Sequence, residues 1–121
     1  MAIDHTPVEE KMTRTLEIVP PDASMSEAAG EMRNRGLGAL LVPTAPPAIV
    51  TKADIVDAVA DGKGPTTPLE EIMTQPAESV PPECPISEAA AMMTTFGVDH
   101  LPVADDDFLG MVSLADITTE P

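Results

Sequence analysis

Apolar residues recur along this chain with helical spacing in two places and as short continuous runs in four others. Two sets of residues meet the helical pattern i, i+3, i+4, i+7: Met25, Ala28, Ala29 and Met32, and Ile86, Ala89, Ala90 and Met93. Each set predicts a helix with one buried stripe, ended by a C-cap glycine at Gly36 or Gly97. Ser24 and Glu27 can form a capping box for the first helix, whereas Pro85 replaces the serine in the second.

The short apolar runs predict buried strands. They are Ala39–Val42 and Ala48–Val50 after the first helix, and His100–Val103 and Leu109–Val112 after the second. Extended pieces at Leu16–Val19 and Ala77–Val80 precede the helices, since each ends at a Pro-Pro pair that forbids helix. A further helix is predicted over residues 52–60, and a shorter one after Ser113. The residues of helix 52–60 expected to face inward are Ile55, Val56 and Val59.

These elements repeat at an offset of 61 residues. Between Met12 and Val42, 14 of 31 positions are identical to the residue 61 places later. The chain is therefore a duplication of a strand–helix–strand–strand–helix unit, which places it in the α/β (α+β) class. The expected parts are a lead-in at residues 1–10 that is loosely held or a short helix, repeats at 11–61 and 70–121, and a linker at 62–69.

A hydroxyl and a carboxylate recur where the last strand of each repeat runs into its last helix. They are Thr51 and Asp54 within Val50–Ile55, and Ser113 and Asp116 within Val112–Ile117. Such a pair is a common helix capping box. It also suits ligand binding, because free N–H groups at a helix start hold anions and a carboxylate accepts from the two hydroxyls of a ribose. Both interpretations stay open, and the presence of two copies favours the second.

Composition narrows the classes of partner. Six basic against 21 acidic residues give a net charge of −15, which opposes binding to nucleic acid and to anionic membranes. Such acidity with few lysines is also typical of proteins from salt-loving organisms. No apolar run is long enough to span a membrane and no signal-peptide pattern opens the chain, so a soluble cytoplasmic protein is expected.

The sequence indicates neither catalysis nor metal binding. The single Cys84 forms no internal disulfide and is interpreted as a small buried hydrophobe. Asp105–Asp107 is interpreted as a solvated turn, because three adjacent carboxylates do not easily converge on one ion. His100 lies in an apolar strand without a nucleophile pattern, which favours a structural or cleft-lining role. We therefore expect no enzyme and no metal site.

Four motifs, in their order and duplication, resemble the tandem cystathionine-β-synthase (CBS) domain pair, or Bateman module. They are Ile72–Thr74, Pro-x-x-Pro-Ile-Ser-Glu-Ala-Ala from Pro82, Gly97–Val103 and Gly110–Ile117. The resemblance runs from Lys11 to Ile117 and implies two β-α-β-β-α repeats packed sheet to sheet around a pseudo-twofold axis. It also implies a homodimer. The wide apolar arc of the second helix supports this, with Ala89, Met92, Met93 and Phe96.

The resemblance implies a regulatory module that binds an adenosine compound in clefts between its repeats and alters the activity of an effector protein. Family ligands are AMP, ADP, ATP, S-adenosylmethionine and sometimes NAD. Asp54 and Asp116 would bind ribose hydroxyls, and Thr51 and Ser113 would lie at the phosphate. The other implied ligand-binding residues are Lys52 beside the first motif and, around the base, Val19, Val80, His100, Pro102 and Ile117.

This chain departs from the family before each aspartate. Many members that bind phosphate carry a basic residue there, whereas this chain has Ala53 and Ala115. Lys52 makes the first motif the better phosphate site, while the second repeat is closer to the family as a whole. The negative charge favours AMP, ADP or S-adenosylmethionine over a triphosphate without a metal. The alternative is an interaction or dimerisation scaffold with degenerate clefts, which the missing basic residues favour.

Overall fold

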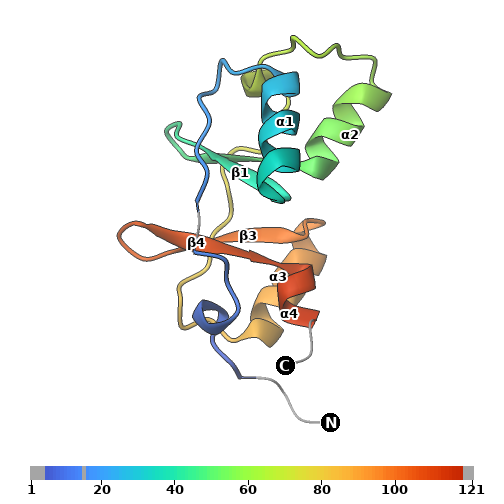
Figure 1. Cartoon of the computed structure of the whole chain (residues 1–121). Coiled ribbons are helices and arrows are strands. Elements are labelled where there is room, and N and C mark those ends of the chain that lie inside the picture. Colours follow the sequence, from blue (N-terminus) through green and yellow to red (C-terminus); the bar gives the residue numbers. More distant parts are fainter. Residues whose placement is uncertain (1–4, 15, 119–121) are drawn as a thin grey trace. The chain divides into compact units, whose positions relative to one another are not determined.

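The computed structural model describes residues 5–14 and 16–118 of the chain (Figure 1). The chain divides into two compact units. One, the first-repeat unit, is Glu17–Ala77. The other, the second-repeat unit, combines the described N-terminal residues up to Leu16 with those from Glu78 to Thr118. The α/β fold of two repeats that the sequence predicts is confirmed.

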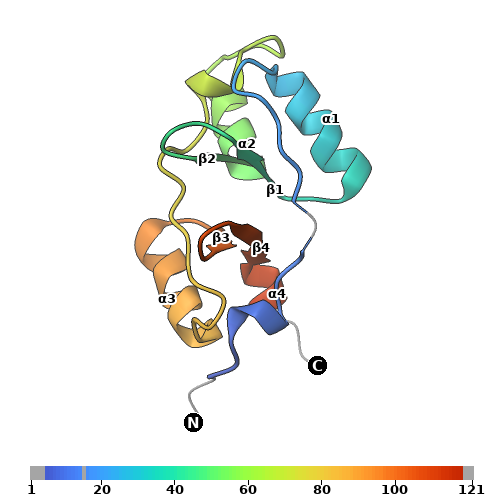
Figure 2. The same ribbon diagram turned by 90° about the vertical axis from the view of Figure 1, so that its left-hand side faces the viewer.

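The first-repeat unit is an antiparallel hairpin with two helices packed on it (Figure 2). Its elements are α1 (Met25–Arg35), β1 (Ala39–Val42), β2 (Ala48–Thr51), α2 (Lys52–Ala60) and the 3-10 helix η2 (Leu69–Glu71). The register of the hairpin places Ala39 opposite Thr51. Two single bridges widen the sheet, from Ile18 to Leu41 in parallel and from Thr74 to Ile49 in antiparallel orientation.

The second-repeat unit has the same arrangement. Its elements are the 3-10 helix η1 (Val8–Glu10), α3 (Ile86–Phe96), β3 (His100–Ala104), β4 (Phe108–Ser113) and α4 (Leu114–Thr118). The register of this hairpin places His100 opposite Ser113. The bridges here are from Val80 to Val103 in parallel and from Thr13 to Met111 in antiparallel orientation.

Three of the four residues of each predicted helical stripe are buried, while Ala29 and Ala90 are half-buried. The buried residues are Met25, Ala28 and Met32 in α1, and Ile86, Ala89 and Met93 in α3. Ser24 caps α1, because its Oγ accepts from the backbone N–H of Glu27 at 3.0 Å. Gly36 and Gly97 end the two helices at φ values of 66° and 68°, a left-handed conformation that glycine adopts freely.

Helix α2 is rotated relative to the prediction. Val56 and Val59, expected to face inward, are 65% and 58% exposed. Ala58 is buried instead, and Ile55 packs at the edge of the core. The physical reason is that the Asp54 carboxylate is hydrogen-bonded back to the end of β2, so the helix turns its Asp54–Ala58 face inward.

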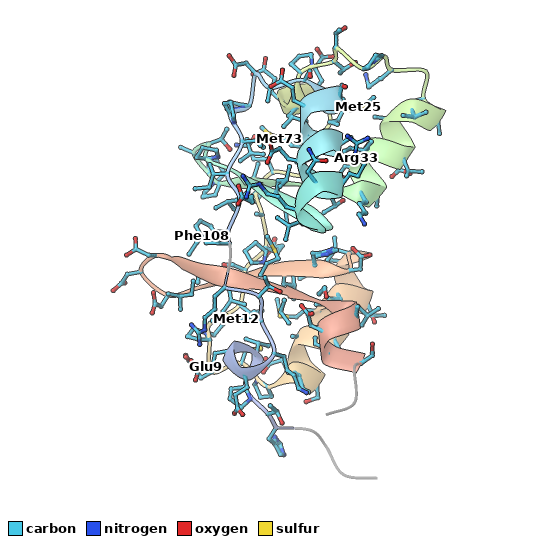
Figure 3. The ribbon with its side chains drawn as sticks, viewed as in Figure 1. Glu9, Met12, Met25, Arg33, Met73 and Phe108 are labelled. Atoms are coloured by element: carbon cyan, nitrogen blue, oxygen red, sulfur yellow. The ribbon has the colours of Figure 1, made fainter. Side chains whose placement is uncertain are left out.

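Each unit is completed by a segment that precedes the other repeat in the sequence. Val8 is fully buried in the core of the second-repeat unit, and its backbone N–H donates to Cys84 O at 2.8 Å. Leu69 is fully buried in the first-repeat unit. Residues Val8–Glu10 of the lead-in thus form a short helix, one of its two expected forms, and Val8 is buried in the core. Met12 and Met73, which match at the offset of 61, pack against the cores of the second-repeat and first-repeat units respectively (Figure 3).

The repeat itself extends further toward the N-terminus than residue 11. Four positions before it are identical at the same offset of 61: Thr6 and Thr67, Pro7 and Pro68, Glu9 and Glu70, and Glu10 and Glu71. These identities are the sequence signal that η1 is the counterpart of η2. Burial of Val8 and Leu69 at matching positions follows from that symmetry.

Gly110 allows the N-terminal segment to lie close against β4. A Cβ atom at this position would lie 2.6 Å from Thr13 O and 2.9 Å from Met12 Sδ. Thr13 and Met111 exchange two backbone hydrogen bonds, of 2.8 and 2.9 Å, at this point of close approach. A side chain at position 110 would therefore push on backbone that is already paired.

We expect Gly110→Ala to lower the free energy of unfolding by about 1–3 kcal/mol, the usual range for overpacking a filled site. Denaturant unfolding at equilibrium measures the change. Gly64→Ala is the matched control, because nothing lies within 4 Å of a Cβ there and its φ is not positive. Equal losses in the two variants would contradict the close approach as the cause.

Candidate functional site

The first candidate motif is a complete capping box at the junction of β2 and α2. The backbone N–H of Asp54 donates to Thr51 Oγ1 at 3.1 Å, and the backbone N–H of Thr51 donates to Asp54 Oδ2 at 3.0 Å. The strand ends and the helix begins at this pair of residues, which is why the two side chains meet. The box fixes the carboxylate in one orientation.

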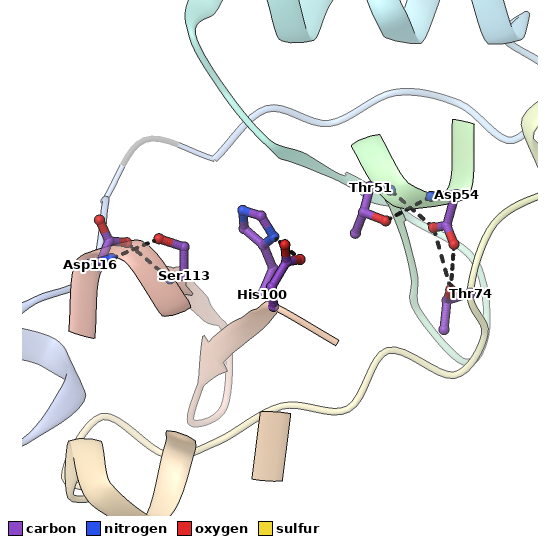
Figure 4. Close-up of polar contacts among 7 residues, drawn as sticks. Thr51, Asp54, Thr74, His100, Ser113 and Asp116 are labelled. Atoms are coloured by element: carbon purple, nitrogen blue, oxygen red, sulfur yellow. Dashed lines mark hydrogen bonds and ion pairs between the residues drawn. The ribbon is translucent and has the colours of Figure 1, made fainter. Parts of the chain in front are cut away.

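The second motif, at the junction of β4 and α4, has the same geometry. The backbone N–H of Asp116 donates to Ser113 Oγ at 3.0 Å, and the backbone N–H of Ser113 donates to Asp116 Oδ2 at 2.9 Å. Within each motif, the structure thus brings the hydroxyl and the carboxylate that the sequence singled out into contact (Figure 4). Because each box uses one acceptor site of the hydroxyl and one of the carboxylate, other lone pairs remain for a ligand's hydroxyls.

Asp54 has a further partner that the sequence did not indicate. Thr74 Oγ1 donates to the Asp54 carboxylate, at 3.2 Å from Oδ1 and 3.4 Å from Oδ2 (Figure 4). Burial raises the pKa of Asp54, and so does the charge of Asp57, while the hydrogen bonds from Thr51 and Thr74 oppose the rise. The repeat places Thr74 opposite Thr13 in the alignment, and that shared Met-Thr pair is the signal that could have drawn attention to it.

Thr74 is positioned by its backbone. It donates to Ile49 O at 2.8 Å and accepts from the backbone N–H of Ile49 at 3.0 Å. The following residue, Gln75, donates from Nε2 to Pro46 O at 2.8 Å. These hydrogen bonds of Thr74 and Gln75 hold the segment in place, so that the Thr74 hydroxyl lies beside Asp54.

His100 lies directly across the β-ladder from Ser113, whereas Ala39 is the residue across from Thr51. The His100 side chain is 17% exposed, and its Nδ1 lies 2.8 Å from Asp99 Oδ1. The residue across the ladder therefore has a polar ring, that of His100, in the second motif and only a methyl group, that of Ala39, in the first. The prediction that His100 lines the site remains a prediction.

The other residues implied by the family resemblance are dispersed. Lys52 is exposed at the start of α2. Val19, Val80 and Pro102 are buried within their own units, and Ile117 packs against the core of the second-repeat unit. Val80 donates from its backbone N–H to Pro102 O at 3.0 Å, so these residues meet through their main chains. Their part in binding a base stays a prediction.

The described residues contain no group of three or more His, Cys, Asp and Glu side chains placed to hold a metal ion. Cys84 is buried, and burial raises the pKa of its thiol, which keeps it protonated. Within the described part of the chain, no helix has both the length and the apolar character needed to cross a membrane.

Comparison with known proteins identifies the family. The sequence matches the CBS domain twice, at residues 8–61 and 69–120. The chain belongs to the CBS-domain family. The assignment to a tandem CBS pair that the sequence motifs predicted is confirmed, and the two matched segments begin near Val8 and Leu69, the two residues that fill the cores.

Two relatives resemble this CBS pair along most of its length. The "Uncharacterized 17.7 kDa protein in bps2 3'region" of Acidianus ambivalens is 31% identical over 117 residues, which are 93% of this chain and 71% of the relative. "Uncharacterized protein MK0525" of Methanopyrus kandleri is 32% identical over 104 residues, 80% of this chain. The chain covers 53% of that second relative, about half of its length.

Two solved structures share the fold of this CBS pair. The hexameric CBS-CP12 protein from bloom-forming cyanobacteria has a TM-score of 0.88 at 29% identity, over 94% of this chain and 70% of that one. The CBS domain pair of protein MJ0100 was solved in complex with 5′-methylthioadenosine and S-adenosyl-L-methionine. It has a TM-score of 0.82 at 24% identity, over 93% of both chains, and shows the shared fold.

We expect the contribution of Asp54 to stability to fall as pH rises. Because its folded-state pKa is raised, the folded chain binds more protons than the unfolded chain between the usual aspartate range and that raised pKa. The free energy of unfolding, relative to that of Asp54→Asn, should therefore decrease with rising pH across this window and then stay constant. Denaturant unfolding of both chains over a pH series measures this, and an increase with pH would contradict it.

Asp57→Asn is the control for this experiment. The Asp57 charge contributes to the raised pKa of Asp54, and its removal leaves the bonds from Thr51 and Thr74 in place. The titration midpoint of the Asp54 carboxyl, followed by side-chain NMR, should therefore move down in this variant.

Proposed function

We propose that this CBS pair is a non-catalytic regulatory module that binds an adenosine-containing ligand through its Ser/Thr-x-x-Asp motifs and alters the activity of a partner protein. The observation that carries the proposal is the duplicated motif. At equivalent positions of both repeats, a carboxylate is fixed by a hydroxyl and a main-chain N–H while retaining acceptor sites. A fixed carboxylate with free lone pairs is suited to the two adjacent hydroxyls of a ribose.

The charges near the motifs bear on the class of ligand. Lys52 is the only basic residue within either motif, and Ala53, Leu114 and Ala115 occupy the neighbouring places. A net charge of −15 opposes ligands with several negative charges. We therefore favour S-adenosylmethionine, AMP or ADP over ATP. The complex of the MJ0100 domain pair with 5′-methylthioadenosine and S-adenosyl-L-methionine supports the nucleoside class.

Regulation requires that the ligand distinguish two states of the chain. A ligand shifts a conformational equilibrium only by the difference in its affinity for the two states, typically worth about 1–3 kcal/mol. We also propose a homodimer and an effector protein as partners. Met92 is half-buried and Phe96 is 47% exposed on α3, which leaves apolar surface for such contacts, and the CBS-CP12 relative is hexameric.

A second candidate function is an interaction scaffold that binds no ligand. One observation favours it: each motif already satisfies its own hydroxyl and carboxylate as a helix cap. On this alternative the paired motifs serve stability alone. Ligand titration distinguishes the two functions.

We expect saturable binding of at least one of S-adenosylmethionine, AMP, ADP, ATP and NAD to the wild-type chain. Calorimetry and thermal shift, at low and high salt, measure it. A ligand at a hundred times its Kd raises the free energy of unfolding by about 2.7 kcal/mol. The double variant Asp54→Asn, Asp116→Asn should weaken binding at least about tenfold, because both carboxylate acceptors become amides.

Asp106→Asn is the control, since Asp106 is exposed in the turn between β3 and β4 and lies outside both motifs. It removes one negative charge without altering either capping box. Absence of binding by all five ligands at both salt concentrations would contradict the proposed function and favour the scaffold.

A further inference from the structure

The two motifs, although alike in their capping boxes, differ in what else reaches the carboxylate. In the first-repeat unit, the Thr74 hydroxyl donates to both oxygens of Asp54, at 3.2 and 3.4 Å. The hydrogen bonds to Asp54 therefore come from Thr51 and from Thr74 (Figure 4). A ligand hydroxyl that approaches Asp54 competes with a donor that belongs to the chain.

The second-repeat unit has the same backbone arrangement without this competitor. Thr13, the counterpart of Thr74, pairs with Met111 as Thr74 pairs with Ile49. Among the described residues, Asp116 forms hydrogen bonds only with Ser113, and none with the Thr13 hydroxyl. Asp116 Oδ2 accepts from the Ser113 N–H, and no described residue donates to Oδ1.

The charged and polar groups around the two carboxylates also differ. Asp54 opens onto a cavity of about 220 Å³ that is also lined by Asp57, Asp61 and Glu71, with Lys63 as the one cation. This concentration of negative charge opposes a phosphate beside Asp54. Beside Ser113, by contrast, His100 stands in the ladder position that Ala39 occupies in the other repeat. Its ring adds a polar group beside the second motif.

From these differences we infer that the two motifs are not equivalent: Asp116 is the carboxylate open to a ligand's diol, and Thr74 occupies Asp54 in place of a ligand. The chain then binds one nucleoside, at the Ser113–Asp116 motif. Thr74 is a specificity-determining residue because it decides which of two similar motifs is free. This inference rests on the proposed function for its ligand and on the Thr74–Asp54 contact for its selectivity.

The test uses calorimetric titration of the full chain with S-adenosylmethionine and, separately, with AMP. The wild-type chain should bind one equivalent, and Asp116→Asn should weaken this binding by more than Asp54→Asn does. Thr74→Val removes the competing hydroxyl with little change of shape. It should strengthen binding at Asp54 about tenfold, seen as a second equivalent, because a hydrogen bond to a charged group no longer has to be replaced.

Two matched variants accompany Thr74→Val. Thr74→Ser keeps the hydroxyl and should bind as the wild-type chain does. Thr13→Val makes the same substitution in the counterpart segment and should create no second equivalent. Two equal sites in the wild-type chain, or a larger loss in Asp54→Asn than in Asp116→Asn, would overturn the inference while leaving the proposed function intact.

A measurement without ligand separates this inference from the proposed function. The Thr74 hydroxyl lowers the pKa of Asp54, so Thr74→Val should raise the midpoint of the Asp54 carboxyl in a side-chain NMR titration. Thr13→Val should leave that midpoint where the wild-type chain has it. An unmoved midpoint in Thr74→Val would overturn the inference whatever the ligands do. Failure of both probes to bind the wild-type chain and Thr74→Val would instead contradict the nucleoside site itself.

Discussion

The fold depends on one interaction: in each unit, a residue from outside the span between the first strand and the last helix of the repeat completes the core. Val8 fills the core of the second-repeat unit and Leu69 that of the first-repeat unit, and both side chains are fully buried. The segments that follow them then pair with β4 and β2. Because those pairings bring Thr13 and Thr74 beside the hairpins, the surroundings of the two motifs follow from how the cores are completed.

The motifs show how one local arrangement can serve both stability and recognition. A capping box satisfies two otherwise unpaired N–H groups at a helix start, and in doing so it holds a carboxylate still. Whether that carboxylate remains available depends on residues outside the box. The Thr74 hydroxyl donates to Asp54 from a segment 20 residues further along the chain. Asp116, by contrast, forms hydrogen bonds only with Ser113 among the described residues. Identical local sequence patterns therefore do not give identical sites.

The parts of the structure that depend on local pattern were predictable from the sequence. Helices α1 and α3 and their buried residues follow from spacing, and the two motifs lie where the strand–helix junctions were expected. The rotation of α2 was not predictable from the apolar pattern, because Val56 is more apolar than Ala58 and yet Ala58 is the buried residue. The core in which Val8 is buried could not be predicted either, because a duplicated sequence does not indicate which of the two repeats a segment packs against.

The segments around Val8 and Leu69 each pack on the unit formed by the other repeat. This exchange also bears on how such a chain arises. A molecule with a single repeat carries its own equivalent of Val8 but has no second repeat to receive it. In the geometry seen here, it completes its core only by trading that segment with another copy, so the single-repeat ancestor is expected to have been an intertwined dimer. Fusion of two copies converts the trade into contacts within one chain, and Glu17–Ala77 is then a continuous stretch that holds every part of one unit.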